Sequence, residues 1–178
     1  IIWHTQGSGK SLTMVWLAKW ILENKSKARV LIVTDRTELD EQIEGVFLGV
    51  GETIVRTKSG ADLLSKLNET SPRLLCSLVH KFGGKDESTI NHFIEEVKIS
   101  KDYSPKGDFI VFIDECHRTQ SGDLHAAMKS VLPENSVFIG FTGTPLLSKD
   151  KKKSIEVFGS FIHTYKFDEA VKDGVILD

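Results

Sequence analysis

Two short segments about a hundred residues apart carry side chains that could act on the same substrate. Residues 4–11 read His-Thr-Gln-Gly-Ser-Gly-Lys-Ser and follow an apolar start. Residues 114–117 read Asp-Glu-Cys-His and follow the apolar run 109–113. The first segment is typical of a loop that binds phosphate groups, and the second has two carboxylates suited to holding Mg²⁺ and activating water. In this order the two segments predict a nucleotide-hydrolysing domain.

The glycine-rich segment has the residue types that phosphate binding requires. Gly7 and Gly9 allow the backbone angles and the close approach that phosphate oxygens need. Lys10 supplies a charge for the β- and γ-phosphates, and Ser11 supplies a hydroxyl for Mg²⁺ at the start of a helix. The usual pattern G-x-x-x-x-G-K-[ST] begins with glycine, whereas this sequence has His4 there. We predict that the nucleotide is bound by Gln6, Gly7, Ser8, Gly9, Lys10 and Ser11.

The acidic pair follows a stretch that reads as a buried parallel strand. Ligands of open α/β sheets bind where the strands end. Asp114 could hold Mg²⁺ directly or through water, and Glu115 could orient or deprotonate the attacking water. The alternative is a solvated strand end that carries two acids, and the upstream loop makes it the weaker reading. We predict catalytic roles for Lys10, Asp114 and Glu115, and metal binding by Ser11 and Asp114.

The elements that must position these residues alternate between strands and helices. Apolar runs such as 29–34 and 109–113 are typical of strands buried on both faces of a parallel sheet. The alternation predicts an α/β fold with right-handed βαβ units, a mostly parallel central sheet and helices on both faces. The predicted strands are 1–3, 29–34, 52–57, 73–79, 109–113, 136–141 and 163–167. The predicted helices are 11–24, 38–47, 61–68, 88–99, 124–132 and 168–172, with surface loops at 81–87 and 148–153.

The composition of the chain limits the number of domains and the kinds of partner that we expect. The chain has 178 residues, 40% hydrophobic and 27% charged, with net charge −2, which fits one domain. A neutral body can still bind DNA through a local basic face. Cys76 and Cys116 form no zinc or disulfide pattern, so we expect a reducing, cytoplasmic setting. No apolar run approaches about eighteen residues, so we expect no membrane partner. The chain lacks an initial Met, and we expect it to be a piece of a longer protein.

Several other residues suggest functions that the sequence supports less well. Residues 96–98, Glu-Val-Lys, match half of a magnesium nuclease site but lack an Asp partner before them. Residues 24–27 lack the Asp of a guanine-reading motif, which disfavours a GTPase. A P-loop kinase would need an acceptor site and a lid, and a nucleotide-gated interaction module without motor activity stays open as an alternative. We expect core positions for Trp3, Trp16 and Trp20, and structural or surface roles for His4, His80, His92, His125 and His163.

Three further segments narrow the reading of the phosphate loop. Residues 34–39 read Thr-Asp-Arg-Thr-Glu-Leu, residues 77–82 read Ser-Leu-Val-His-Lys-Phe, and residues 140–146 read Gly-Phe-Thr-Gly-Thr-Pro-Leu. With the first two segments they stand in the order of motifs I, Ia, Ic, II and III of superfamily 2 helicases and translocases. The set resembles the motor (R) subunit of type I restriction–modification enzymes, whose version of the loop also fits His4. The resemblance covers nearly the whole chain.

This resemblance implies that residues 1–178 form a single RecA-like P-loop NTPase domain, the first of two motor domains in a larger bacterial or archaeal protein. It implies ATP and Mg²⁺ as cofactors. Double-stranded DNA, the modification and specificity subunits and the remaining domains of the parent chain are the implied partners. The parent enzyme would use ATP hydrolysis to translocate DNA before another domain cleaves it. By itself the domain would hydrolyse ATP poorly, because the arginine finger comes from the second motor domain.

The resemblance also implies roles for residues outside the nucleotide contacts. His117, Thr142 and Thr144 would couple nucleotide state to DNA contact, and Arg36 and Lys81 would face the DNA backbone. Another superfamily 2 DNA translocase or helicase, of the chromatin-remodelling or DExH type, is the alternative. The sequence Thr-Gly-Thr-Pro at 142–145 favours duplex DNA translocases over DEAD-box RNA helicases, which have Ser-Ala-Thr there.

Overall fold

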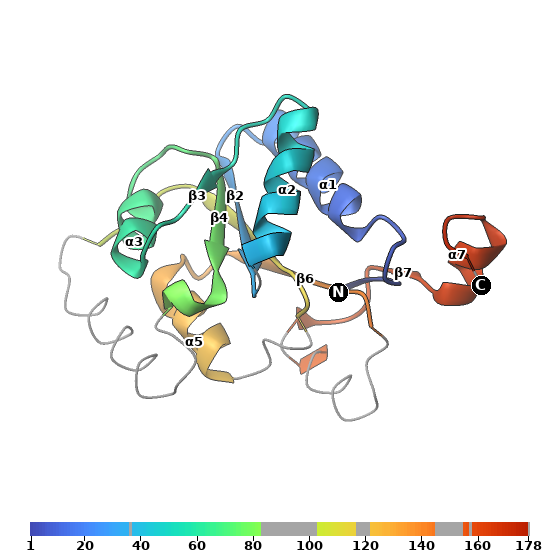
Figure 1. Cartoon of the computed structure of the whole chain (residues 1–178). Coiled ribbons are helices and arrows are strands. Elements are labelled where there is room, and N and C mark those ends of the chain that lie inside the picture. The colour runs from blue at the N-terminus through green and yellow to red at the C-terminus, as the bar shows by residue number, and fades with distance from the viewer. Residues whose placement is uncertain (36, 83–102, 117–121, 145–154, 157, 178) are drawn as a thin grey trace.

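The computed structural model describes residues 1–35, 37–82, 103–116, 122–144, 155–156 and 158–177 (Figure 1). The strands are β1 (Ile2–His4), β2 (Ala28–Thr34), β3 (Val55–Arg56), β4 (Leu74–Leu78), β5 (Asp108–Ile113), β6 (Val137–Thr142) and β7 (His163–Tyr165). The helices are α1 (Lys10–Asn24), α2 (Thr37–Gly49), α3 (Gly60–Asn68), α5 (Gly122–Val131), α7 (Phe167–Lys172) and the 3₁₀ turn η1 (Val79–Phe82). None of the helices in these ranges is long and apolar enough to cross a membrane.

The seven strands form one sheet in the order β3-β4-β2-β5-β6-β1-β7, and every pairing between them is parallel. All seven residues of the inner strand β2 are buried. Val33 pairs with Ile113, so β2 and β5 end at nearly the same level. This confirms the predicted parallel sheet, and it places the segments that follow these strands along one edge.

Helices cover both faces of the sheet (Figure 1). On one face α1 and α2 pack over a cluster that includes Met14 and Phe112. On the other face α3 and α5 pack over a cluster that includes Leu63 and Val111. Because successive side chains of a strand point to opposite faces, the neighbours Val111 and Phe112 of β5 feed different clusters. The segments that follow the strands are therefore the parts of the sheet that these helices leave accessible at its carboxyl edge.

The boundaries differ from the predictions at several elements. The edge strand β3 has two residues instead of the predicted 52–57, and it pairs with β4 alone. The predicted strand 73–79 ends at Leu78, because the chain turns there into η1. Helix α7 begins at Phe167, one residue early, where the Glu169 carboxylate accepts the Lys166 N–H at 2.7 Å. The predicted helix 88–99 and the loop 148–153 lie outside the described residues, as does most of the loop 81–87.

The predicted core positions of two tryptophans are wrong. Trp16 and Trp20 are 59% and 56% exposed, and Leu12 is exposed on the same side of α1. The helix buries a different face, made of Met14, Val15, Ala18 and Ile21. A helix over a sheet buries one stripe only, and the smaller side chains occupy it here. Trp3, in contrast, is half-buried and packs with the ring of Phe161 at a centroid distance of 6.3 Å.

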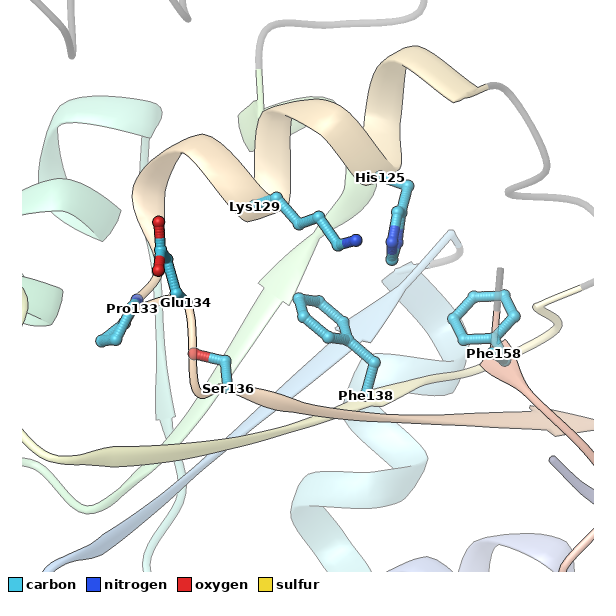
Figure 2. A pocket seen from close by; sticks show the side chains of 7 residues that line it. All are labelled: His125, Lys129, Pro133, Glu134, Ser136, Phe138 and Phe158. Atoms are coloured by element: carbon cyan, nitrogen blue, oxygen red, sulfur yellow. The ribbon is translucent and has the colours of Figure 1, made fainter. Parts of the chain in front are cut away.

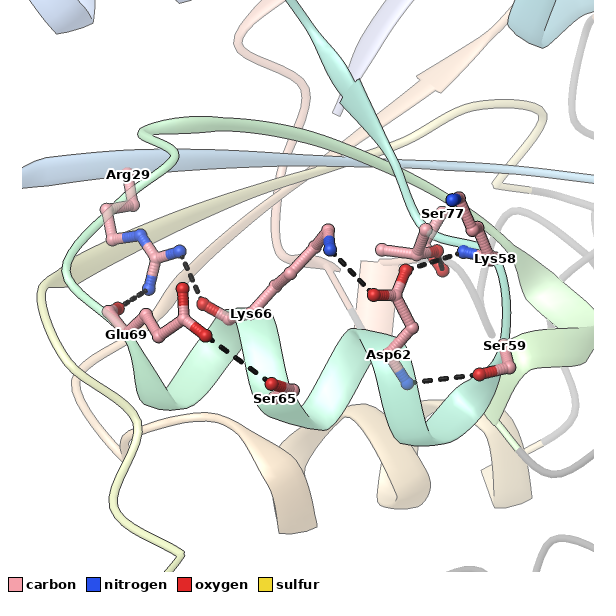
Figure 3. Close-up of polar contacts among 9 residues, drawn as sticks. Arg29, Lys58, Ser59, Asp62, Ser65, Lys66, Glu69 and Ser77 are labelled. Carbon is pink, nitrogen blue, oxygen red and sulfur yellow. Dashed lines mark hydrogen bonds and ion pairs between the residues drawn. The ribbon is translucent and has the colours of Figure 1, made fainter.

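At the amino edge of the sheet, a buried cation joins β2 to α3 and its flanking segments (Figure 3). Arg29 is 1% exposed and lies 4.9 Å from the ring centroid of Phe109. Its guanidinium donates hydrogen bonds at 2.5–3.1 Å to the carbonyl oxygens of Lys66, Leu67, Glu69, Pro72 and Lys106. The last carbonyls of a helix have no partner within the helix, and a cation at that end also suits the helix dipole. Arg29 therefore satisfies the end of α3 and fixes it to the sheet.

Replacing Arg29 with Met should lower the free energy of unfolding by about 3–5 kcal/mol, because several buried carbonyls would lose their donor together. Urea unfolding followed by circular dichroism measures the change. Arg56→Met is the matched control, since Arg56 pairs with Glu44 at 3.4 Å where both side chains are about one-third exposed. That variant should change stability by under about 1 kcal/mol. Equal effects of the two substitutions would contradict the role given to Arg29.

Candidate nucleotide-binding site

The phosphate loop connects β1 to α1 and contains two left-handed glycines. Gly7 has φ +82° and Gly9 has φ +89°, conformations that side-chain-bearing residues rarely adopt. The Ser8 hydroxyl donates to the Thr5 carbonyl at 2.6 Å and closes the turn between them. Gly9 has no side chain with which to cap α1. The first N–H groups of the helix consequently stay available for an anion, which the helix dipole also favours.

The acidic pair is held by the two strands that flank β5. The Asp114 N–H donates to the Val33 carbonyl at 2.9 Å, and the Cys116 N–H donates to the Phe141 carbonyl at 2.9 Å. Between them Glu115 has φ +48°, and within the described ranges no other non-glycine residue has a positive φ. This conformation costs roughly 1–2 kcal/mol. Such strain occurs where the surrounding structure requires a particular side-chain direction.

Cys116 packs behind the pair against β6. A Cβ atom at Gly140 would lie 2.9 Å from the Cys116 sulfur and 3.3 Å from Cγ of Phe158. Glycine is therefore needed at this position for close approach. Burial raises the pKa of the Cys116 thiol to about 12. The thiol stays protonated at neutral pH and acts as a small apolar side chain beneath the acidic turn.

Lys10 joins the two segments. Its ammonium lies 2.8 Å from Oδ1 of Asp114 and also hydrogen-bonds to Oε1 of Glu115. Burial acts to lower the pKa of Lys10, but the two carboxylates outweigh it and the pKa is raised. Lys10 therefore stays charged at neutral pH. The structure thus brings together the two segments that the sequence separates by about a hundred residues.

Asp114 has the environment of a metal ligand. It is 1% exposed, and among the described residues none donates a hydrogen bond of good geometry to either carboxylate oxygen. Burial raises the pKa of Asp114 above its usual range, although the Lys10 ammonium acts to lower it. Mg²⁺ prefers carboxylate and hydroxyl oxygens, often through water, so Asp114 and Ser11 fit this cation. No group of three or more His, Cys, Asp or Glu side chains in the described ranges could hold a metal, so phosphate oxygens would have to complete the shell.

The segment after β6 contacts both parts of the site. A Cβ atom at Gly143 would lie 3.6 Å from Oε1 of Glu115 and 3.7 Å from the backbone nitrogen of Gln6. Thr142 is buried, and its hydroxyl donates to the Thr144 carbonyl at 3.3 Å. The Thr144 N–H lies 3.4 Å from the same hydroxyl oxygen. Motif III therefore touches the phosphate loop and the acidic pair through the backbone around Gly143.

The structure describes only some of the remaining predicted site residues. Lys81 lies half-buried in η1, directly after β4, at the same sheet edge as the phosphate loop. Arg36 and His117 lie outside the described residues, so their predicted DNA and coupling roles stay predictions. Gln6 is exposed at the loop surface, as a nucleotide contact requires.

The sequence reading missed a contact beside the loop. His4 and His163 were expected to be scattered structural or surface residues, but their ring nitrogens Nε2 and Nδ1 lie 3.1 Å apart. The one signal for His4 in the sequence was its place at the usual first glycine of the phosphate-loop pattern. His163 carried no signal, because β7 reaches β1 only in the folded sheet.

A separate pocket of about 540 Å³ lies between α5 and β6 (Figure 2). The ring of His125 packs with Phe138 at 5.1 Å and with Phe158 at 5.9 Å between centroids. Burial and, secondarily, Lys129 lower the pKa of His125. The lining residues are His125, Lys129, Pro133, Glu134, Ser136, Phe138 and Phe158. None of them belongs to the phosphate loop or the acidic pair, so this pocket is not part of the candidate nucleotide site.

Comparison with known proteins identifies the family. The SWI2/SNF2 ATPase family matches this chain over residues 1–178. The chain belongs to this family. Among solved structures, the Sulfolobus solfataricus SWI2/SNF2 ATPase core in complex with double-stranded DNA is similar at a TM-score of 0.60 and 15% identity. The match covers 96% of this chain and 33% of that one.

Two more solved structures share the fold. The Pyrococcus furiosus Hef helicase domain matches with a TM-score of 0.60 and 18% identity, over 93% of this chain and 34% of that chain. A nuclease-deletion mutant of the type ISP restriction–modification enzyme LlaGI in complex with a DNA substrate mimic matches with a TM-score of 0.62 and 18% identity. That match covers 96% of this chain and 18% of the enzyme. The fold is therefore the RecA-like fold of helicase motor domains, as predicted.

The sequence relatives are endonuclease subunits of type I restriction enzymes. A protein of Methanocaldococcus jannaschii that is provisionally named as a subunit of this kind is 35% identical over 179 residues. The match covers 99% of this chain and 16% of that relative. A Staphylococcus aureus subunit is 32% identical over 99% of this chain and 18% of its own length. The HindI subunit of Haemophilus influenzae is 33% identical over 98% of this chain and 17% of its own length. The chain thus spans less than a fifth of the length of these relatives and resembles them in the predicted way.

Asp114→Asn tests the balance of charges in the site. The raised pKa means that ionised Asp114 lowers the stability of the fold above the usual Asp pKa of about 3.9, by about 1.4 kcal/mol per pKa unit. In the absence of nucleotide at pH 7, the variant should therefore be as stable as wild type or more stable. The difference that arises from this ionisation should vanish toward about pH 3, below the usual Asp pKa of about 3.9, where the carboxyl is protonated in both the folded and the unfolded chain. Urea unfolding at the two pH values measures it.

Asp108→Asn, at the exposed start of β5, is the control for this substitution and should leave stability unchanged at both pH values. A clear loss of stability in Asp114→Asn at pH 7 would show that attraction to Lys10 outweighs the burial of the carboxylate.

Proposed function

We propose that residues 1–178 form the first RecA-like motor domain of the endonuclease (R) subunit of a type I restriction–modification enzyme. In this proposal the domain binds ATP with Mg²⁺ and uses hydrolysis to translocate double-stranded DNA before another domain cuts it. The contact of Lys10 with both Asp114 and Glu115 at the carboxyl edge of a parallel sheet is the observation that carries it. Membership of the SWI2/SNF2 ATPase family supports the same chemistry.

Each residue of the site has a defined task in this proposal. Lys10 and the N–H groups of the loop bind the phosphates, and Ser11 and Asp114 hold Mg²⁺. Glu115 orients or deprotonates the attacking water. While Lys10 is hydrogen-bonded to Glu115, the base is occupied. The phosphates of a bound nucleotide compete for the Lys10 ammonium, so their arrival frees Glu115 for its role.

The DNA part of the proposal depends on the relatives and on the sheet edge. The matching SWI2/SNF2 core was solved with double-stranded DNA, and LlaGI with a DNA substrate mimic. We place DNA contacts on the segments that follow β2 and β4, around Arg36 and Lys81, and coupling on His117, Thr142 and Thr144. The modification and specificity subunits and the rest of the parent polypeptide are the proposed partners, in the cytoplasm of a bacterium or archaeon.

Another superfamily 2 DNA translocase or helicase is the second candidate, because the Hef helicase domain has the same fold. Assay of ATPase activity in the full-length parent with duplex DNA, single-stranded DNA and RNA separates the candidates. The type I proposal requires stimulation by duplex DNA carrying the recognition site, in the presence of the specificity subunit. Stimulation by RNA or by forked DNA alone would favour the alternative.

Nucleotide binding should be visible as a shift in thermal unfolding. A ligand at a hundred times its dissociation constant adds about 2.7 kcal/mol to the stability of the folded state. We expect saturating Mg·ATP or Mg·ADP to raise the midpoint of the wild-type chain and to leave that of Lys10→Ala unchanged. Lys19→Ala is the control, because Lys19 lies on the same helix and pairs with Glu23 and Glu52. An equal shift in Lys10→Ala would place the nucleotide elsewhere.

Hydrolysis by the isolated chain should be very slow. An arginine finger supplied by a second domain contributes about 10³–10⁵ in rate, and the proposal assigns that residue to the second motor domain. A phosphate-release assay on the purified chain, beside Glu115→Gln, measures the residual rate. Turnover of several per second that Glu115→Gln abolishes would contradict the need for a second motor domain.

A further inference from the structure

A line of hydrogen bonds connects β7 to the phosphate loop. Nδ1 of His163 lies 3.1 Å from Nε2 of His4, and Nδ1 of His4 lies 3.5 Å from the hydroxyl of Thr13. That hydroxyl in turn donates to the carbonyl of Gly9 at 3.2 Å. The line crosses from β7 to β1, then to α1, and ends on the left-handed glycine before Lys10.

The hydrogens can be arranged along this line in one way that satisfies every contact. If His163 donates from Nδ1 to His4 Nε2, His4 carries its own proton on Nδ1 and donates to Thr13. Thr13 is then free to donate to the Gly9 carbonyl. The Gly9 carbonyl also accepts the Thr13 backbone N–H at 3.0 Å, so the hydroxyl is its second donor. The reverse arrangement uses the hydroxyl proton for His4 and loses that second hydrogen bond. The first arrangement forms one more hydrogen bond and is therefore favoured.

Two further contacts attach the same C-terminal segment to the loop. The Thr5 N–H donates to the Tyr165 carbonyl at 2.9 Å. A Cβ atom at Gly7 would lie 3.4 Å from Cγ2 of Ile176. The strand β7 lies at the edge of the sheet and pairs with β1 alone. Its contacts with residues 4–9 therefore link the conformation of the loop to residues 163–176.

The surroundings of His4 keep it neutral. His4 is nearly buried, and burial and then the neighbouring His163 lower its pKa. The groups that face it are His163 and Tyr165 from β7 and Thr13 from α1. Tyr165 donates its own hydroxyl to Asp173 at 2.8 Å, so no carboxylate is directed at the imidazole from these elements. A proton added to His4 would place a charge on a nearly buried ring and would require His163 to give up its Nδ1 proton, so it would disturb the line.

We propose that His4 is a positioning residue for the nucleotide site, which holds the Gly9 carbonyl and the phosphate loop through Thr13 and is itself oriented by His163. In this role it replaces the first glycine of the usual loop pattern with a specific tether to β7. The inference rests on the proposed nucleotide binding by residues 6–11. It assigns His4 no contact with substrate.

The test measures Mg·ADP affinity by titration calorimetry in the full-length protein that contains this chain, from pH 8 to pH 5.5. His4→Gly and Thr13→Val should each weaken binding about tenfold at pH 8, equivalent to about 1.4 kcal/mol. His4→Gln, which keeps one donor and one acceptor, should retain most of the affinity. Wild type should lose affinity below the unperturbed His pKa of about 6.5, as His4 gains a proton, and His4→Gln should not. Comparing variants at each pH cancels the protonation of the nucleotide.

His125→Gln is the matched control, because His125 is also a partly buried histidine of lowered pKa but lies in the pocket beside α5. It should bind nucleotide as wild type does at every pH. Thermal unfolding without nucleotide checks that each variant is folded, and Thr13→Val gives the test independently if His4→Gly does not fold. Unchanged affinity and an unchanged pH profile in both variants would overturn the role of His4. Failure of wild type to bind more tightly than Lys10→Ala would overturn the nucleotide site itself, and this inference with it.

Discussion

The geometry of the candidate site depends on one interaction, the contact of the Lys10 ammonium with the carboxylates of Asp114 and Glu115. A buried charge is costly unless it has a partner, and the Lys10 ammonium lies 2.8 Å from Oδ1 of the buried Asp114 carboxylate. Lys10 can reach it only if the loop after β1 and the turn after β5 are held at the same sheet edge. The parallel pairing of β1 with β6, and of β6 with β5, provides that alignment. In the proposed function, the same ammonium is the group for which the phosphates of a nucleotide would compete.

The site and the opposite edge of the sheet differ in how completely their polar groups are satisfied. At the amino edge, Arg29 donates to five carbonyls and needs nothing further. At the carboxyl edge, the oxygens of Asp114 accept no hydrogen bond of good geometry from the described residues, Glu115 has a strained backbone and the first turn of α1 has no side-chain cap. Incomplete satisfaction at one edge is what a ligand can exploit, because its own groups complete the contacts.

Much of the fold and the site could be predicted from sequence because the signals were local. Continuous apolar runs such as 29–34 and 109–113 identify buried parallel strands, and the residues directly after them must meet at one edge. The glycines of the phosphate loop are also a local signal, because they permit backbone conformations that other residues rarely adopt. Features that depend on packing between distant segments carried no such signal. The contact of His4 with His163 joins positions 159 residues apart in the chain, and nothing in either neighbourhood indicates the other. The sequence around Arg29 likewise does not indicate that this residue is buried or that it binds the carbonyl groups at the end of α3.

The two exposed tryptophans show where such reasoning fails and what the failure means physically. Large aromatic side chains are usually counted toward the core, yet α1 buries Met14 and Ala18 against the sheet and leaves Trp16 and Trp20 outside. The buried positions 14, 15, 18 and 21 lie on one side of the helix, whereas Trp16 and Trp20 share an exposed side with Leu12. A helix that packs on a sheet buries one stripe of its surface. The position of a residue relative to that stripe therefore decides whether it is buried, and the size of its apolar side chain does not.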